Sequence, residues 1–258
     1  MADENEHVNI WMRPERPARG PRPAYSRAQI TEAAVRVADA EGLDAASMRR
    51  IAAEIGTGAM SLYRYVPSRD DLIELMVDHV TGELDLPAAP TGDWRADLTL
   101  LAERDRAVRL RHPWVQDTRP VRYSFGPNQL RVLEFGVGAL DLGIPIDDMM
   151  MLFGLVEGYV ETRVREELAW DEELRRSGIS KEGWMARSGQ YVMRLVNSGE
   201  HPIFTRIVMD ARQPHMGREA GFRCGLERIL DCIEGVLPAA PKEPAPRRID
   251  RDSGQELA

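Results

Sequence analysis

Few residues of this sequence have the types and spacing that catalysis or metal binding requires. Its five histidines are scattered, at His7, His79, His112, His201 and His215. They form no H-E-x-x-H pair and no cluster with cysteine. Cys224 and Cys232 are eight residues apart, which places them on one helical face rather than in a metal knuckle. We therefore expect no catalytic site, no cofactor and no metal site, and the chain is predicted not to be an enzyme.

Side chains suited to binding nucleic acid gather instead in residues 47–69, SMRRIAAEIGTGAMSLYRYVPSR. The candidates are Arg49, Ala59, Met60, Ser61, Tyr63, Arg64, Tyr65 and Arg69. An arginine can bind guanine O6 and N7 with two hydrogen bonds, hydroxyl groups can bind phosphate, and small or apolar side chains suit thymine methyl groups. Structural roles are the alternative to DNA binding for three residues of this segment. Leu62 and part of Tyr63 could belong to the core, and Arg64 could be a solvated cation.

These side chains need a scaffold, and the sequence predicts two short helices. Ser47 caps a helix over residues 48–55, residues 56–58 form a glycine-bearing turn, and a second helix over residues 59–65 ends before Pro67. This order is typical of a helix-turn-helix, whose second helix enters the DNA major groove. The alternative is a surface helical hairpin of a larger all-α core.

The flanking segments complete an N-terminal domain over residues 25–84. Ser26 and Gln29 have capping-box spacing and begin one helix, and Ser68 begins another that ends near Leu84. Residues 1–24 are dense in proline and arginine, so they are predicted to be a disordered basic arm. Such an arm either lies in a DNA minor groove or is an unremarkable leader.

Charge divides the chain into a basic head and an acidic remainder. Residues 13–69 hold ten arginines and six acids, whereas residues 70–258 carry a net charge of −9. The basic excess is small, but its place fits a DNA-binding head on a body that does not bind polyanions.

The remainder is predicted to be helical throughout, so the fold class is all-α. Residues 85–91 should be a linker, and residues 238–258 a disordered tail, on either side of a larger domain over residues 92–237. Its helices are expected at residues 93–111, 128–142, 147–174, 180–196, 202–209 and 218–237. Within the longest helix, we expect residues 149–160 to be buried all round and the charged residues after them to lie at the surface or on a partner. The apolar seam of the last helix is expected to form a dimer bundle.

The N-terminal pattern over residues 26–83 resembles the DNA-binding domain of the TetR family of transcriptional regulators. The features that match are the capped first helix, Glu41-Gly42-Leu43, the helix-turn-helix, Leu62-Tyr63, Pro67-Ser68-Arg69 and the amphipathic helix that follows. The resemblance implies an all-α homodimer whose C-terminal domain dimerises and binds an effector, and the body is most similar to the tetracycline-repressor-like branch. The metal ligands of that branch do not map onto this chain, so whether a metal accompanies the effector stays open.

The resemblance also implies individual roles in DNA binding. By position, it implies base reading by Ala59, Met60 and Ser61, base or phosphate contact by Arg49, and groove contact by Arg64. It also implies phosphate and thymine contacts by Tyr63 and Tyr65, and phosphate binding by Arg69. Two residues depart from the family pattern, because Gly58 replaces a serine-like helix cap and Val66 replaces a phenylalanine. Since Ala59 is not a polar reader, base reading should rest mainly on Arg49, Ser61 and Arg64.

An effector pocket in the body would be lined by aromatic and methionine side chains, which give an adaptable apolar surface. The candidates are Trp94, His112, Trp114, Phe125, Met150, Phe153, Tyr159 and Trp184. The alternative for each is a place in the ordinary core, and for His112 an exposed position at a helix C-terminus.

The sequence thus predicts a dimeric, cytoplasmic regulator that binds double-stranded DNA. We expect a repressor that leaves a palindromic operator when a small hydrophobic effector binds. The rival is a small-molecule-binding or structural helical protein without specific DNA readout, which Gly58 and Ala59 favour. No apolar run reaches the roughly 18 residues needed to span a bilayer, so no membrane partner is expected.

Overall fold

The computed structural model describes residues 9–13, 25–118, 125–212 and 216–238. The head contains η1 (Ile10–Met12), α1 (Arg27–Glu41), η2 (Leu43–Ala45), α2 (Met48–Glu54), α3 (Ala59–Leu62) and α4 (Arg69–Thr81). The body contains α5 (Trp94–Arg111), η3 (Pro113–Asp117), α6 (Pro127–Gly138), α7 (Ile146–Ser177), α8 (Lys181–Ser198), α9 (Pro202–Asp210) and α10 (Arg218–Glu234). Within these described ranges every regular element is helical, so the all-α prediction is confirmed.

Local signals fix the helices of the head. Ser26 and Gln29 form the predicted capping box of α1, and Gly42 ends that helix with a φ of 86°. Ser47 and Ser68 cap α2 and α4 through the amide groups of Arg50 and Asp71. The core residues between these helices include Ile30, Ala34, Ile51, Leu62 and Leu72, all with no exposed surface. The head is therefore a small four-helix unit around an aliphatic core.

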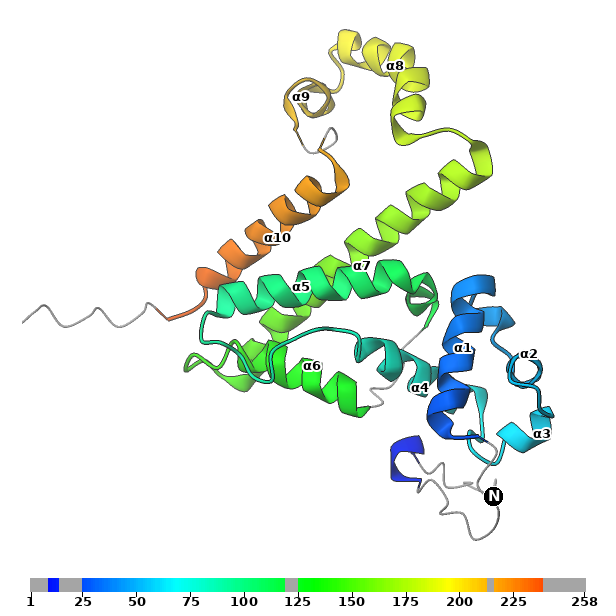
Figure 1. Ribbon diagram of the computed structural model, residues 1–258. Coiled ribbons are helices and arrows are strands. Elements are labelled where there is room, and N and C mark those ends of the chain that lie inside the picture. The colour runs from blue at the N-terminus through cyan, green and yellow to red at the C-terminus, as the bar shows by residue number, and fades with distance from the viewer. Residues whose placement is uncertain (1–8, 14–24, 119–124, 213–215, 239–258) are drawn as a thin grey trace, which may run out of the picture.

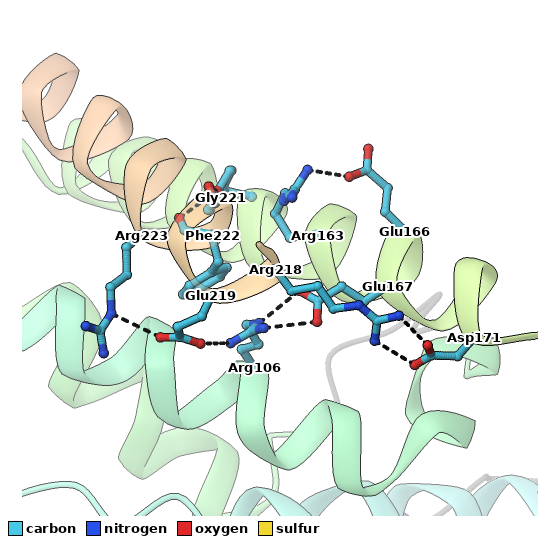
Figure 2. A network of polar contacts seen from close by, with 11 residues as sticks. Arg106, Arg163, Glu166, Glu167, Asp171, Arg218, Glu219, Gly221, Phe222 and Arg223 are labelled. Atoms are coloured by element: carbon cyan, nitrogen blue, oxygen red, sulfur yellow. Dashed lines mark hydrogen bonds and ion pairs between the residues drawn. The ribbon is translucent and has the colours of Figure 1, made fainter. Parts of the chain in front are cut away.

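Charged side chains as well as apolar ones tie the body together, as Figure 2 shows. Arg106 of α5 donates from Nε and Nη2 to the two oxygens of Glu167 on α7, each at 3.0 Å, and from Nη1 to Glu219 on α10 at 2.8 Å. The guanidinium also lies 4.7 Å from the ring centre of Phe222. Glu167 was expected at the surface, but it is only 5% exposed. That expectation is wrong because a bidentate partner compensates the burial of its charge.

The first half of α7 is amphipathic rather than buried all round. Met149 and Leu152 face the core, whereas Met150, Met151 and Leu155 are 43%, 56% and 46% exposed. The prediction of central burial is wrong for this face, because helices of the same chain cover only one side of α7. An apolar face of α7 is therefore exposed on the surface of the single chain.

In the last helix, α10, the apolar side chains are more buried within the chain than predicted. The seam of α10 that was expected to meet a partner includes Phe222, Leu226 and Ile233, which are at most 2% exposed within the single chain. These side chains pack against the body, where α10 lies along α7 (Figure 1). The predicted dimer seam is thus used for the subunit's own core.

Helices α8 and α9 extend away from the rest of the body at the end of α7 (Figure 1). Neither has a buried residue, and both carry apolar side chains on their surface. The exposed ones are Trp184, Tyr191, Met193, Ile203, Ile207 and Met209. Among the helices that the structure describes, none is both long and apolar enough to cross a bilayer.

Candidate nucleic-acid interface

The recognition segment, residues 59–65, is one turn of α-helix followed by a hydrogen-bonded turn. Regular helix covers Ala59–Leu62, and residues 63–65 continue as a turn in which the amides of Tyr65 and Val66 donate to the carbonyl of Leu62, at 2.8 and 3.0 Å. Leu62 and Val66 have no exposed surface and fix this segment to the head core. The helix expected through residue 65 is therefore shorter, because the core anchors Leu62 and Val66 tighten the chain into a turn after Leu62.

The side chains expected to read DNA lie on the outer side of this segment. Met60 is 80% exposed and Tyr63 is 44% exposed. Arg64 is also exposed, whereas Ala59, Ser61 and Tyr65 are half-buried. Leu62 is core, as the structural alternative had it. The exposed set gives a mixed apolar, phenolic and cationic surface that suits a major groove.

Two arginines of the predicted DNA-binding set, Arg49 and Arg64, are exposed. Within the part of the chain that the structure describes, Arg49 and Arg64 make no hydrogen bond or ion pair. Their neighbour Arg50 differs, since it binds Glu41 at 2.7 Å and Glu54 at 2.9 Å. Those two carboxylates raise the pKa of Arg50 through hydrogen bonds. Arg49 and Arg64 are therefore available to an anion, and Arg50 is already bound.

Arg69, the predicted phosphate contact at the start of α4, already makes two contacts within the head. Arg69 donates from Nη2 to the carbonyl of Leu43 at 3.2 Å and to Asp44 at 3.3 Å, while its side chain remains 49% exposed. The pair with Asp44 is exposed, so competition with a phosphate costs little. Arg69 thus stays accessible at the edge of the recognition segment.

Two residues predicted to line an effector pocket lie instead at the joint between head and body. His112 is 4% exposed, and its Nδ1 and Nε2 face Asp39 of α1 at 2.7 Å and Glu83 at 3.3 Å. Trp114 donates from Nε1 to the same Asp39 oxygen at 2.7 Å. Burial acts to raise the pKa of Glu83, but hydrogen bonds from His112 and Arg111 outweigh it and lower that pKa. This cluster joins α1, the end of α4 and the end of α5.

The other predicted pocket residues are spread over the body. Tyr159 donates to the carbonyl of Phe222 at 2.8 Å, and Phe153 packs against Gly136 of α6. Trp94 is half-buried, and Met150, Phe125 and Trp184 are exposed. An open hollow of ≈ 440 Å³ exists elsewhere, lined by Asp93, Arg95, Ala96, Thr99, Leu100, Glu103 and Glu227. The described residues therefore do not bring the predicted set around one cavity.

A charged cluster inside the body was missed from the sequence. Arg109 donates from Nε to Asp105 at 2.7 Å and from Nη2 to Glu157 of α7 at 3.4 Å. Burial, with the charge of Asp105, raises the pKa of Glu157 to about 8. The Oε1 atom of Glu157 is buried and has no hydrogen-bond partner among the described residues. The four-residue spacing of Asp105 and Arg109 is the only part that the sequence could have signalled.

Comparison with known proteins agrees with this arrangement over most of the chain. Residues 30–76 match the family described as bacterial regulatory proteins, tetR family, and residues 86–237 match the tetracyclin repressor-like C-terminal domain. The chain is 35% identical to the HTH-type transcriptional repressor DrrR1 of Streptomyces coeruleorubidus, over 92% of this chain and 87% of that protein. It is 34% identical to an HTH-type transcriptional regulator of Saccharopolyspora erythraea, over 70% of this chain and 78% of that protein.

Solved structures give the same result for the fold. The TetR family protein ActR of Streptomyces coelicolor, in complex with actinorhodin, is similar with a TM-score of 0.66 and 25% identity, covering 84% of this chain and 99% of that chain. The relatives are DNA-binding regulators of transcription and not enzymes, in agreement with the sequence prediction. Because the matches cover the body as well as the helix-turn-helix head, this chain belongs to the TetR family of bacterial transcriptional regulators.

Proposed function

We propose that this regulator is a homodimeric repressor that binds a palindromic operator and releases it when a small hydrophobic effector enters the body. The observation that carries the proposal is the head surface itself. Arg49 and Arg64 are exposed and unpaired in the described part of the chain, and Arg50 is bound to acids. Met60 and Tyr63 are also accessible on the recognition segment. A surface of this kind is built to bind an anion in a groove.

Selection from a random duplex pool tests the operator. The full-length protein is incubated with the pool, and bound DNA is recovered and sequenced. We expect a palindrome whose half-sites are centred about one helical turn, or a multiple of it, apart. A random background would contradict the proposal and favour the rival function, a helical protein without specific DNA readout.

The body supports an effector through its likeness to ActR, whose structure contains actinorhodin. An effector can release the operator only by binding one arrangement of the heads better than another. Helix α4 offers a route, since Asp78 accepts hydrogen bonds from the amides of Asn128 and Gln129 at the start of α6, at 2.9 and 3.0 Å. A ligand that moves α6 would thus move α4 and the head.

A thermal-shift screen tests this step with actinorhodin and a panel of aromatic small molecules. An effector should raise the melting temperature in proportion to the logarithm of its concentration above the dissociation constant. The same compound should release the selected palindrome in a mobility-shift titration. A compound that stabilises the protein but leaves DNA binding unchanged would contradict effector-driven release by that compound class.

Dimerisation is supported by the apolar surface that one chain leaves open. Met151 and Leu155 on α7, and Trp184 and Ile203 on α8 and α9, are between 46% and 63% exposed. A single helix-turn-helix grips only a few base pairs, and two related by a two-fold axis can read a palindrome. The exposed apolar faces of α7, α8 and α9 are the surface that a second copy would cover.

A further inference from the structure

The N-terminal segment contains an ordered turn where a disordered arm was expected. Residues 9–13 depart from the prediction made for residues 1–24, while residues 1–8 and 14–24 lie outside the described residues. Asn9 accepts from the amide of Trp11 at 2.9 Å and begins the turn η1. Ile10 has no exposed surface and belongs to the main hydrophobic core. A turn with a fully buried isoleucine is part of the folded unit.

One arginine connects this turn to the end of the recognition segment. Arg27 of α1 donates from Nη1 to the carbonyl of Ile10 at 3.4 Å and from Nη2 to that of Arg13 at 3.3 Å. Its Nε donates to the carbonyl of Tyr65 at 3.4 Å. The same guanidinium therefore holds the turn and the last residues before Val66, which anchors the recognition segment in the core.

The other side of the turn contacts the body. A Cβ atom at Gly126 would lie 2.7 Å from the Trp11 ring and 2.3 Å from Asp78, so only glycine fits between them. Gly126 is the N-cap of α6, and Asp78 is the residue of α4 that accepts from the first amides of α6. Trp11 thus packs at the point where the head meets the first turn of α6.

We propose that residues 9–13 form a clasp in which Ile10, Trp11 and the positioning residue Arg27 tie the recognition segment to the first turn of α6. The clasp is a further connection between head and body, beside the covalent one through α4 and the bonds of His112 and Trp114 to Asp39 of α1. It limits how far the head can turn on the body in the absence of DNA. Its consequence for operator binding rests on the proposed function, whereas its structural role does not.

Hydrogen–deuterium exchange of the full-length protein tests the clasp without DNA or effector. Ile10→Asp places a carboxylate in the core and should open the clasp. We expect exchange to accelerate roughly tenfold in two distant peptides, residues 62–68 and residues 126–132, while α7 and α10 keep their protection. The matched control is Met12→Asp, because Met12 lies in the same turn but is 78% exposed, and it should change neither peptide. Acceleration confined to residues 9–13, or spread equally over α7 and α10, would overturn the proposal.

A second variant covers the case in which Ile10→Asp does not fold. Arg27→Gln removes the shared guanidinium and should accelerate exchange at residues 62–68 while residues 126–132 keep their protection. Unchanged exchange at residues 62–68 would overturn the role of Arg27.

A DNA titration then measures the consequence on the selected palindrome. Ile10→Asp should bind it more weakly than Met12→Asp, and equal affinities would remove the clasp from DNA recognition. If selection recovers no palindrome, the proposed function fails, and the exchange result still decides whether the clasp exists.

Discussion

At the scale of single residues, neighbouring arginines on α2 provide a matched pair. Arg49 is exposed without a partner in the described structure, and Arg50 binds Glu41 and Glu54. Each substitution to alanine removes one positive charge, so general attraction to DNA falls equally. Only Arg49 can make a new contact without breaking an existing one.

We therefore expect Arg49→Ala to weaken operator binding by roughly 10- to 100-fold. Arg50→Ala should weaken it by less than about threefold, as the loss of one charge that makes no direct contact with DNA does. Mobility-shift titrations at one fixed salt concentration measure both. Equal losses for the two variants would show that Arg49 acts only through its charge.

The raised pKa of Glu157 should make the stability of the folded protein depend on pH. Its pKa is raised to about 8 by burial and by Asp105, against 4.5 for an ordinary glutamate. Between these two values the folded state holds a proton that the unfolded state has lost, so the free energy of unfolding falls as pH rises. Glu157→Gln removes this titration.

Melting temperatures at pH 5 and pH 8 test this prediction. Glu157→Gln should lose less stability across the interval than the wild type, whereas the control Glu172→Gln should behave as the wild type, since its pair with Arg175 is exposed. The same loss in all three proteins would show that Glu157 is ionised in the folded state throughout.

At the scale of elements, the turn before the recognition segment contains two glycines with different requirements. Gly58 is the N-cap of α3, with an ordinary extended φ of −88° and open space around its Cβ position. Gly56 has a φ of 73°, which side chains other than glycine rarely adopt. The same substitution should therefore act in opposite directions at the two positions.

Gly58→Ser should stabilise the protein by about 0.3 kcal/mol, because the hydroxyl can accept a free amide of α3. Gly56→Ser should destabilise it by about 1 kcal/mol or more. Urea unfolding gives both free energies. A destabilising Gly58→Ser would mean that α3 does not gain from a side-chain cap.

The elements that could be predicted from the sequence are those with local causes. Ser26, Ser47 and Ser68 mark helix starts because their hydroxyl groups satisfy nearby amides, and all three cap helices in the structure. The turn at Ile10 could not be predicted in this way, since three residues carry no periodicity and the neighbouring prolines favour disorder. Its order comes from Arg27 and Gly126, which are distant in sequence.

The candidate site residues also differ in whether local sequence or long-range packing determines their positions. Met60, Tyr63 and Arg64 are exposed on the outer side of the head, as the local pattern predicts, whereas Ala59, Ser61 and Tyr65 are half-buried because the core anchors Leu62 and Val66 lie beside them. The proposed pocket residues depend on how helices pack, and His112 and Trp114 lie at the head–body joint because Asp39 of α1 binds both. An aromatic residue's type does not show which neighbour will cover it.

At the scale of the whole molecule, the apolar face of α7 predicts the state of assembly. Met151 and Leu155 lie one helical turn apart and are both exposed. The wild type should have twice the chain mass of 29.1 kDa in light scattering after size exclusion. Met151→Glu combined with Leu155→Glu should shift it to the single-chain mass, because a buried interface does not tolerate unpaired carboxylates.

The control for this prediction is Glu32→Lys, an exposed change on α1 of the head that should leave the mass unchanged. If the α7 double variant keeps the double mass, the dimer uses another surface, such as α8 and α9.

We expect the two heads of one dimer to bind the two halves of a palindrome. Titrations of the wild type onto the selected palindrome, and onto the same duplex with one half-site scrambled, measure this paired recognition. We expect one dimer per palindrome and affinity at least about 100-fold lower for the scrambled duplex. Equal affinity for the two duplexes would contradict paired recognition and leave only non-specific attraction to the DNA backbone.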